Sequence, residues 1–540
     1  MKARLLALFG LLALLAGAPQ AQRGLLEPST FEEALEQYER YIKMKPLDLH
    51  SLAWARLARS HDPRGLKILI DSYKKPQQFK QVSRYLLAQI ATREFKKDEF
   101  VDQLVGWREK YDDDQDAWLW YRTLSIECTN RGPETALAIA LNPKMSLPLR
   151  AAAIEAMGFG KDPSGLFKAI EHYTQAMPKK LPEKAMLVGA MGTALEKHKR
   201  LVTKREFKIA CSYFISLLND EFGLDDSTKL MVARSLARIL DSEEIVINSA
   251  PWTALLGDKK KKIKRGKEEE EYVRPTFFGV EATGSRICYV IDMSDSMCKD
   301  VVIPEDAKGP ISGGPDAKKP KNPIPWHLVK TRFDLAREQV KLSLRNLDPD
   351  AMFSVIYFGD QSDLLDSSKG MVKASKGNVK KIIKELDGIE TLSSTPQRPD
   401  GRLRGFTNLH SGMRNAFRVK KKGLLDEDSY IDLKQFTEGA DTIFLLSDGN
   451  PSTDDYRIGD VHVGERNVGD PETGAQGGEA TNLMYEGPYR NQQILLEEIE
   501  RLNLFREVEI HCVAVGKDVS VRFLEDIAKL GHGKMTRLGD

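Results

Sequence analysis

The chain contains 540 residues, which exceeds one ordinary domain and allows roughly three to five domains of ~100–200 residues. Hydrophobic residues make up 41% of the chain and charged residues 30%, a composition that excludes a wholly disordered chain. The 81 basic and 79 acidic residues give a net charge of +2, which argues against a chain built around a global nucleic-acid-binding field.

The chain begins with the pattern of a secretory signal peptide. Met1 to Arg4 is basic, and the apolar run from Leu5 to Ala16 is followed by small residues. Because this run is shorter than the ~20 apolar residues that span a bilayer, we predict a removable signal peptide over residues 1–21. The alternatives are an uncleaved membrane anchor and a buried N-terminal helix. From this signal peptide we expect the mature protein to be exported (periplasmic, secreted or cell-surface) and to have no transmembrane segment after cleavage.

Residues 30–250 carry apolar residues at three- and four-residue spacing, which predicts a succession of helices. The clearest cover residues 31–44, 79–90, 183–201, 206–218 and 227–240. The stretch from Asp62-Pro63 to Tyr73 recurs, 100 residues later, from Asp162-Pro163 to Tyr173. This offset is about twice the ~40–47 residues of a HEAT-type helical pair. The region therefore resembles HEAT-type repeats, which stack into a solenoid; a non-repetitive helical bundle is the alternative.

Residues 251–284 change abruptly in charge. Seven of the nine residues from Lys259 to Lys267 are basic, and Glu268 to Glu271 are four consecutive acids. Adjoining blocks of opposite sign are typical of a solvated linker, and this one lacks the aromatic residues of a nucleic-acid patch. We predict a charged linker and lead-in between two folded parts.

After residue 285 the pattern becomes an alternation of strands and helices. The segment 286–291 is continuously apolar, as expected of a strand covered on both faces. Further strands are predicted at 352–358, 442–446 and 508–515, and helices at 332–347, 374–386, 408–417, 492–503 and 520–530. This alternation predicts an α/β doubly wound (Rossmann-like) domain over residues 285–540, in which ligands bind at the carboxyl ends of the strands.

Polar side chains end two of these predicted strands. The first strand runs into Asp292, Ser294 and Ser296, and the strand at 442–446 runs into Asp448. Between them, Thr407 lies at the predicted start of a helix. Two carboxylates and three hydroxyls can therefore converge at one edge of the sheet. Such an all-oxygen donor set suits a hard cation such as Mg²⁺.

In the order and spacing of these five residues, the chain resembles a von Willebrand factor type A (VWA) domain with a metal-ion-dependent adhesion site (MIDAS). The resemblance covers residues 285–540. It implies that Ser294 and Ser296 bind the metal directly, that Thr407 binds directly or through water, and that Asp292 and Asp448 act largely through waters and hydrogen bonds. One position would stay open for a Glu or Asp carboxylate of a protein partner. The metal implied is Mg²⁺, with Mn²⁺ or Ca²⁺ as alternatives; ordinary turn residues or a metal-free site are the competing interpretations.

Three long loops are predicted beside the site, at residues 298–326, 388–404 and 449–487. Loops of this length are usually functional or disordered, and we predict that they select the partner.

The five cysteines form no C-x-x-C pair, which excludes a disulfide scaffold and a zinc ribbon. Cys288 and Cys512 fall on predicted buried strands that, in the family's strand order, are separated by one strand, so both are predicted to be free thiols. Cys298, beside the metal loop, is the thiol expected to be reactive or paired.

Motifs of common enzyme classes, such as H-E-x-x-H, G-x-S-x-G and Walker A, do not occur in the sequence. His410 and His511 stand alone, and His511 is predicted to be a structural residue in a core strand. We therefore predict a non-enzymatic, exported binding protein whose helical array is a second interaction scaffold. One alternative is an RNA-binding protein, because Ro-type ribonucleoproteins have a similar domain order. The other is a metal-dependent hydrolase, for which no general base is evident near the site.

Overall fold

The computed structural model describes residues 30–538 apart from residues 77, 258–262, 264–275, 278, 302–324, 390–402, 404, 427–430, 457–486 and 517–518. The chain groups into two compact units, one of residues 1–110 with 456–488 and the other of residues 111–455 with 489–540. The predicted signal peptide, most of the charged linker and most of the three long loops lie outside the described residues. Within the described part of the chain, no helix is long and apolar enough to cross a membrane.

The described residues of the first unit form a run of helices: α3 (Phe31–Tyr41), α4 (Leu47–Arg59), α5 (Pro63–Lys74), α6 (Lys80–Glu94) and α7 (Val101–Arg108). Helix α4 packs against α3, α5 and α6, and α5 packs against α6 and α7. Helix α3 begins with a capping box, in which Thr30 and Glu33 satisfy each other's backbone N–H groups. The apolar side chains that face between these helices, such as Leu57, Leu66 and Leu86, are fully buried.

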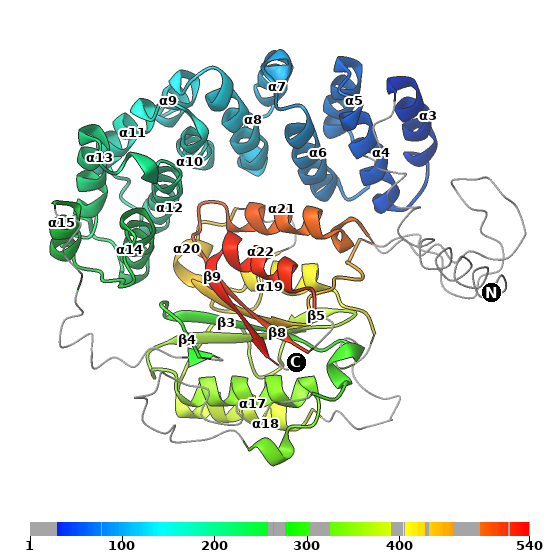
Figure 1. The fold of residues 1–540 in the computed structure, drawn as a ribbon, viewed down its shortest axis with the longest axis vertical. Coiled ribbons are helices and arrows are strands. Elements are labelled where there is room, and N and C mark those ends of the chain that lie inside the picture. Colours follow the sequence, from blue (N-terminus) through cyan, green and yellow to red (C-terminus); the bar gives the residue numbers. More distant parts are fainter. Residues whose placement is uncertain are drawn as a thin grey trace, which may run out of the picture. The chain divides into compact units, whose positions relative to one another are not determined.

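The second unit begins with helices in two layers (Figure 1). Helices α8 (Ala117–Asn130), α10 (Leu147–Ala156), α12 (Leu181–Lys197) and α14 (Asp226–Leu240) pack side by side in chain order. Helices α9 (Glu134–Ala140), α11 (Ser164–Gln175), α13 (Arg205–Ser216) and α15 (Ser249–Gly257) form the other layer in the same way. Each helix therefore buries its apolar stripe against its neighbours, and the predicted helical N-terminal region is confirmed.

The two copies of the repeated sequence segment have the same local structure. Helices α5 and α11 both start at an Asp-Pro pair, where Asp62 accepts a hydrogen bond from the Arg64 N–H at 2.8 Å and Asp162 accepts one from the Ser164 N–H at 3.0 Å. Tyr73 and Tyr173, near the ends of these helices, are both 2% exposed. The sequence repeat thus corresponds to a repeated helix start and a repeated buried face.

The α/β part of the second unit contains a sheet with the strand order β5-β4-β3-β7-β8-β9. The strands from β4 to β9 in this order pair in parallel; they are β4 (Met352–Phe358), β3 (Arg286–Asp292), β7 (Thr442–Ser447), β8 (Glu509–Val515) and β9 (His532–Leu538). The short strands β5 (Ser362–Leu364) and β6 (Val372–Lys373) pair with β4 in the antiparallel direction. The predicted α/β domain with a mostly parallel sheet is therefore confirmed.

Buried thiols lie on two strands of this sheet. Cys288 on β3 and Cys512 on β8 are separated by β7, as predicted, and both are free. Burial raises the pKa of both thiols far above the usual range, so neither is a nucleophile at neutral pH. The sequence interpretation of these two cysteines is confirmed.

Helices cover both faces of the sheet (Figure 1). Helices α17 (Arg332–Arg345) and α18 (Lys376–Asp387) lie on one face, over buried side chains that include Tyr289, Phe353 and Phe444. Helices α19 (Leu409–Arg418), α21 (Gln492–Asn503) and α22 (Val521–Leu530) lie on the other face, over Val290 and Ile510. Alternate residues of β3 therefore enter opposite cores, which is why its sequence is apolar throughout.

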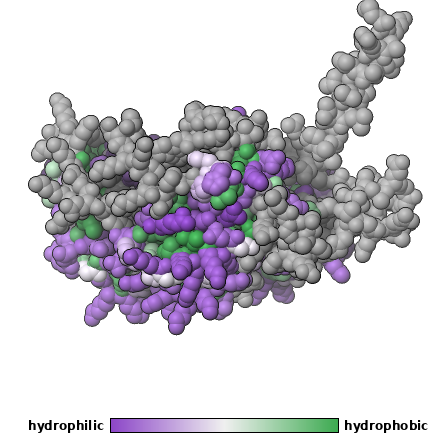
Figure 2. Space-filling view, turned by 90° about the horizontal axis from the view of Figure 1, so that it is seen from below, coloured by the Kyte–Doolittle hydropathy of each residue, from purple (hydrophilic) through white to green (hydrophobic). Residues whose placement is uncertain are grey.

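The side of the α/β part that carries α18 faces solvent. Lys376, Lys380 and Lys384, spaced four residues apart on α18, are exposed. Among the residues coloured in Figure 2, those on this side are mostly hydrophilic and surround a small hydrophobic area. The apolar side chains Ile382 and Leu386 of the same helix are buried.

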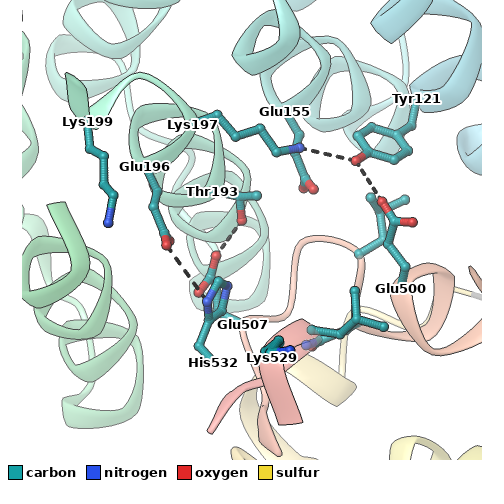
Figure 3. Close-up of a pocket in the computed structure, with 13 residues that line it drawn as sticks. Tyr121, Glu155, Thr193, Glu196, Lys197, Lys199, Glu500, Glu507, Lys529 and His532 are labelled. Carbon is teal, nitrogen blue, oxygen red and sulfur yellow. Dashed lines mark hydrogen bonds and ion pairs between the residues drawn. The ribbon is translucent and has the colours of Figure 1, made fainter. Parts of the chain in front are cut away.

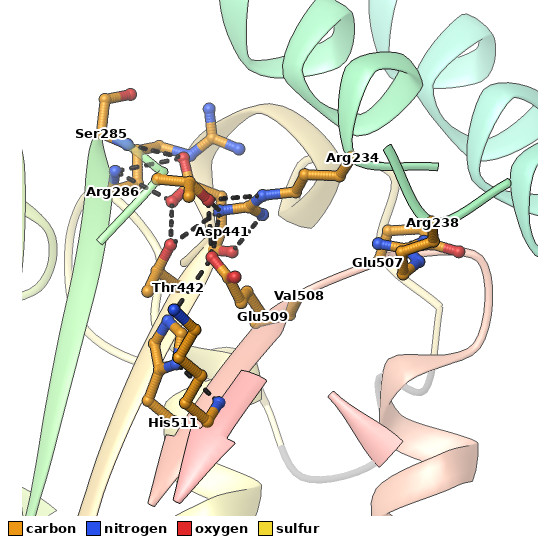
Figure 4. Close-up of polar contacts among 12 residues, drawn as sticks. Arg234, Arg238, Ser285, Arg286, Asp441, Thr442, Glu507, Val508, Glu509 and His511 are labelled. Atoms are coloured by element: carbon orange, nitrogen blue, oxygen red, sulfur yellow. Dashed lines mark hydrogen bonds and ion pairs between the residues drawn. The ribbon is translucent and has the colours of Figure 1, made fainter. Parts of the chain in front are cut away.

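The helical layer of the second unit contacts the amino-terminal ends of the strands through buried polar groups (Figure 4). Arg234 of α14 donates to the carbonyl oxygen of Asp441 at 2.9 Å and to Thr442 Oγ1 at 3.0 Å. It also forms an ion pair with Glu509 at 3.0 Å and hydrogen bonds with Thr283 Oγ1. The guanidinium group of Arg234 therefore links Asp441, just before β7, to the first residue of β7 (Thr442) and the first residue of β8 (Glu509).

A second contact lies one helical turn further along α14. Arg238 pairs with Glu507, which precedes β8, and with Glu196 of α12 at 2.6 Å. Helix α12 also approaches this segment closely, because a Cβ atom at Gly189 would collide with the carbonyl oxygen of Phe505. The helices and the sheet of this unit thus share ion pairs and close backbone packing.

Candidate metal site

Two of the predicted site segments lie at the carboxyl ends of neighbouring strands. Asp292 is the last residue of β3, and Asp448 follows directly after β7. Because β3 and β7 run parallel, with Ile291 beside Leu446, both ends reach the same edge of the sheet. The fold therefore brings the Asp292–Ser296 turn and Asp448 together across more than 150 residues of sequence.

Hydrogen bonds fix the turn that follows β3. Asp292 Oδ1 accepts hydrogen bonds from the Ser294 N–H at 2.9 Å and from Ser294 Oγ at 2.6 Å. Ser294 Oγ lies 2.9 Å from Ser296 Oγ. The other carboxylate oxygen of Asp292 accepts a hydrogen bond from Ser447 Oγ at 2.7 Å. The three residues of the D-x-S-x-S segment are therefore held in one connected cluster of oxygen atoms.

Thr407 reaches the same edge on a loop before α19. The Asp295 N–H donates to the carbonyl oxygen of Gly405 at 3.3 Å, which ties this loop to the D-x-S-x-S turn. Gly405 has a φ of +77°, and a Cβ atom there would collide with Asp360. The Thr407 N–H donates to Ser452 Oγ at 2.9 Å, and the Ser452 N–H donates to the Thr407 carbonyl at 3.0 Å. Thr407 is thus joined both to the turn after β3 and to the segment after Asp448.

The cluster is buried and rich in negative charge. Asp292 is fully buried, and Thr407 and Asp448 are each 8% exposed. Burial and the nearby charge of Asp448 raise the pKa of Asp292 to about 7. The chemistry of this donor set, two carboxylates and three hydroxyls, fits a hard divalent cation. No group of three or more His, Cys, Asp or Glu side chains suited to a metal occurs in the described part of the chain, so a metal here would depend on the hydroxyls.

Arg332 is a member of this site that sequence reasoning missed. It is the first residue of α17, and its guanidinium group pairs with Asp448 Oδ2 at 3.2 Å. Both side chains are largely buried, with 6% and 11% of their surfaces exposed. The guanidinium group lies against Gly516, which has a φ of +106° at the end of β8. Arg332 therefore supplies one positive charge beside the Asp448 carboxylate.

A second buried cluster supports the loop that carries Thr407. His410 of α19 stacks on Tyr489 with ring centroids 3.9 Å apart and lies 3.8 Å from Glu498 of α21. The Tyr489 N–H donates to Asp454 at 2.7 Å, and Arg501 Nε donates to Glu498 at 2.7 Å. His410, which belongs to no recognisable motif in the sequence, is thus part of a cluster of aromatic and charged side chains next to the loop that carries Thr407. His511, on β8, accepts a hydrogen bond from the Lys534 N–H and stacks on Phe444, as expected of a structural residue.

No protein-family model matches the chain, and no curated protein is significantly similar to it. Two solved structures are distantly similar to about half of it. One is a von Willebrand factor type A protein from Catenulispora acidiphila, with 14% identity over 48% of this chain and 40% of that chain and a TM-score of 0.27. The other is a mutant of the PilB minor pilin from Streptococcus sanguinis, with 13% identity over 47% of this chain and 56% of that chain and a TM-score of 0.24. The fold class therefore rests on the strand order and helix layers described above.

Proposed function

We propose that the α/β part is a VWA-type domain that binds Mg²⁺ at its carboxyl edge and, through the metal, a carboxylate of a protein partner. The observation that carries the proposal is the connected oxygen cluster of Asp292, Ser294 and Ser296, with Asp448 beside it at the end of the adjacent parallel strand. A cation at this point would offset the charge of two buried carboxylates, of which Asp448 pairs with Arg332.

In this proposal the hydroxyls of Ser294 and Ser296 hold the metal directly, and Thr407 does so directly or through water. Asp292 orients Ser294, to which it is already hydrogen-bonded, and Asp448 acts through water beside Arg332. Few anionic ligands would then contact the cation, so it stays electrophilic toward an incoming Glu or Asp carboxylate. Mn²⁺ and Ca²⁺ are alternative occupants.

The rest of the chain is assigned a supporting role. The signal peptide would export the protein, and the HEAT-like helices of residues 30–250 would provide a second interaction surface. The function proposed is binding without catalysis, in keeping with the lack of the enzyme motifs H-E-x-x-H, G-x-S-x-G and Walker A in the sequence.

The metal is tested by titrating the full-length protein with Mn²⁺, followed by electron paramagnetic resonance and calorimetry. Ser294→Ala should weaken Mn²⁺ binding by at least about tenfold, or about 1.4 kcal/mol. Ser212→Ala, at an exposed position of α13, is the matched control and should bind like the wild type. Equal Mn²⁺ binding by both variants would contradict the proposed ligand set.

The partner is tested separately, by affinity capture with the full-length protein in Mg²⁺ and in a chelator. A true partner should be lost with the chelator and with Ser294→Ala, and retained by Ser212→Ala. Replacing the partner's contacting Glu or Asp with its amide should abolish the interaction. A partner that binds equally well in the chelator would contradict a metal-mediated contact.

A further inference from the structure

A cleft of about 320 Å³ lies where the helical layer of the second unit meets its α/β part (Figure 3). Its lining includes Tyr121 of α8, Glu155 of α10 and Lys197 of α12 on one side, and Glu500 of α21 and His532 of β9 on the other. The cleft is near the amino ends of β8 and β9, so it is distinct from the candidate metal site at the carboxyl edge. Its volume is at the small end of the range for small-molecule sites.

Most of the carboxylates in the cleft already have partners. Glu196 and Glu507 both pair with Arg238, which is itself largely buried. Glu500 accepts a hydrogen bond from Tyr121 Oη at 3.2 Å. These groups are satisfied within the protein and need no ligand.

Glu155 and Lys197 differ from the rest, because the charge of each acts mainly on the other, yet the two groups form no direct ion pair among the described residues. Glu155 is 5% exposed, and its Oε2 atom has no hydrogen-bond partner among the described residues. The Lys197 ammonium group donates to Tyr121 Oη at 3.3 Å and lies 3.7 Å from the centroid of the Phe159 ring. Within the described part of the chain it has no carboxylate at ion-pair distance. Figure 3 shows both side chains directed into the cleft, so one carboxyl and one ammonium group are available to a ligand.

We propose that this cleft binds a small zwitterion, a free α-amino acid, with the ligand ammonium at Glu155 and the ligand carboxylate at Lys197. A purely cationic or purely anionic ligand would contact only one of the two groups favourably, whereas a zwitterion inserted between them would contact both. Leu504 and Leu530 line the same cleft and offer contact to an apolar ligand side chain. The proposal is independent of the metal site.

The protonation of Glu155 agrees with this arrangement. Burial raises the pKa of Glu155 to about 8, against the lowering effect of Lys197, and the charges of Glu507 and Glu500 add to the rise. Burial also lowers the pKa of Lys197, so in the free protein both groups are shifted toward their neutral forms. A ligand ammonium group favours the ionised Glu155 carboxylate, and a ligand carboxylate favours the protonated Lys197 ammonium group, so binding should shift both groups toward their charged forms.

The test is calorimetric titration of the full-length protein with L-leucine and two analogues. Leucinamide lacks the carboxylate that would contact Lys197, and N-acetyl-L-leucine lacks the ammonium group that would contact Glu155. Each analogue should bind at least about tenfold more weakly than L-leucine. Glu155→Gln and Lys197→Met should each weaken L-leucine binding to a similar degree, while Lys204→Met, at an exposed position before α13, should not.

Several results would overturn the proposal. These are the absence of L-leucine binding, equal binding of either analogue, or unchanged binding by the variants. The analogue comparison uses the wild-type protein, so it decides the matter even if a variant fails to fold.

Discussion

Thr442 and Ser447, the first and last residues of β7, belong to two polar networks, one at the amino ends and one at the carboxyl ends of the parallel strands. Thr442 Oγ1 accepts a hydrogen bond from Arg234 of the helical layer at 3.0 Å, and Ser447 Oγ donates to Asp292 Oδ2 at 2.7 Å. All six residues of β7 are buried. One short, rigid strand therefore links the contact with the helices to the candidate metal site.

Replacing Arg332 with methionine should destabilise the metal-free protein. The change leaves the buried Asp448 carboxylate without its ion-pair partner, which typically costs about 3–5 kcal/mol. Mg²⁺ should recover part of this loss if it binds beside Asp448. Urea denaturation with and without Mg²⁺ measures both effects. Arg522→Met, at an exposed position of α22, serves as the control, and an Arg332→Met variant as stable as this control would rule out the role given to the ion pair.

Replacing Arg234 with methionine should weaken the contact between the helices and the sheet of the second unit. The variant leaves Glu509 uncompensated and removes the donors to the Asp441 carbonyl and to Thr442, for an expected loss of about 3–5 kcal/mol. Arg205→Met, at an exposed site, should stay within about 0.5 kcal/mol of the wild type. Denaturant unfolding followed by tryptophan fluorescence measures the difference. Equal midpoints for the two variants would contradict this assignment.

The ion pair between Glu498 and Arg501 should make stability depend on acid pH. Burial opposes ionisation, but the charge and hydrogen bonds of Arg501 lower the pKa of Glu498 from 4.5 to about 2. A folded-state pKa below the unfolded value means that the stabilisation is fully present above pH 4.5 and is lost as the pH falls toward 2.

Above pH 4.5, Glu498→Gln should therefore lower the free energy of unfolding by about 3 kcal/mol. The difference in this free energy between the variant and the wild type should shrink as the pH falls toward 2. Thermal unfolding across the acid range gives the measurement. Glu221→Gln, at an exposed position, should show no such convergence. A gap that stays constant with pH would show that the loss is steric and not electrostatic.

Two glycine substitutions should have opposite effects. At Gly189 of α12, an alanine methyl group would collide with the Phe505 carbonyl oxygen, so Gly189→Ala should destabilise the protein by about 1–3 kcal/mol. At Gly106 of α7 nothing lies within 4 Å of the added methyl group, and Gly106→Ala should stabilise the helix by about 0.5–1 kcal/mol. Differential scanning calorimetry of the two variants measures the change in melting temperature. A Gly189→Ala protein that is more stable than the wild type would contradict the close packing of α12 against the Phe505 carbonyl.

Most of the sheet could be predicted from the sequence because its strands are continuous apolar runs. Strand β4 and helix α21 have the predicted bounds, and β3, β7 and β8 differ from the prediction by one residue each. Strand β9 (His532–Leu538) was missed, since its sequence is mostly polar and lacks a strand pattern. It becomes a strand by hydrogen bonding to β8 at the edge of the sheet, which is a tertiary effect. Strands β5 and β6 are too short to give a signal.

The five residues of the predicted donor set could be found from the sequence because each lies after an apolar strand or at the start of a predicted helix, whereas the arginine beside them was missed. Asp292, Ser294 and Ser296 are adjacent in the sequence and follow an obvious strand. Arg332 is the first residue of a helix, a position that is usually solvated, and its partner Asp448 is 116 residues away. Arg234 and Glu509, 275 residues apart, also read as ordinary surface charges. Sequence patterns reveal which residues are apolar, but not which charged residues are buried against each other.

The ion pairs between α14 and the start of β8 limit how this chain can be divided. A fragment that begins after the charged segment at 258–275 would keep Glu507 and Glu509 but lose Arg238 and Arg234. Exchanging the helices next to the sheet for those of another protein would likewise leave these two carboxylates without their arginine partners. The charged segment at 258–275 therefore marks a change in sequence composition, but the helices before it and the α/β part after it depend on each other for stability.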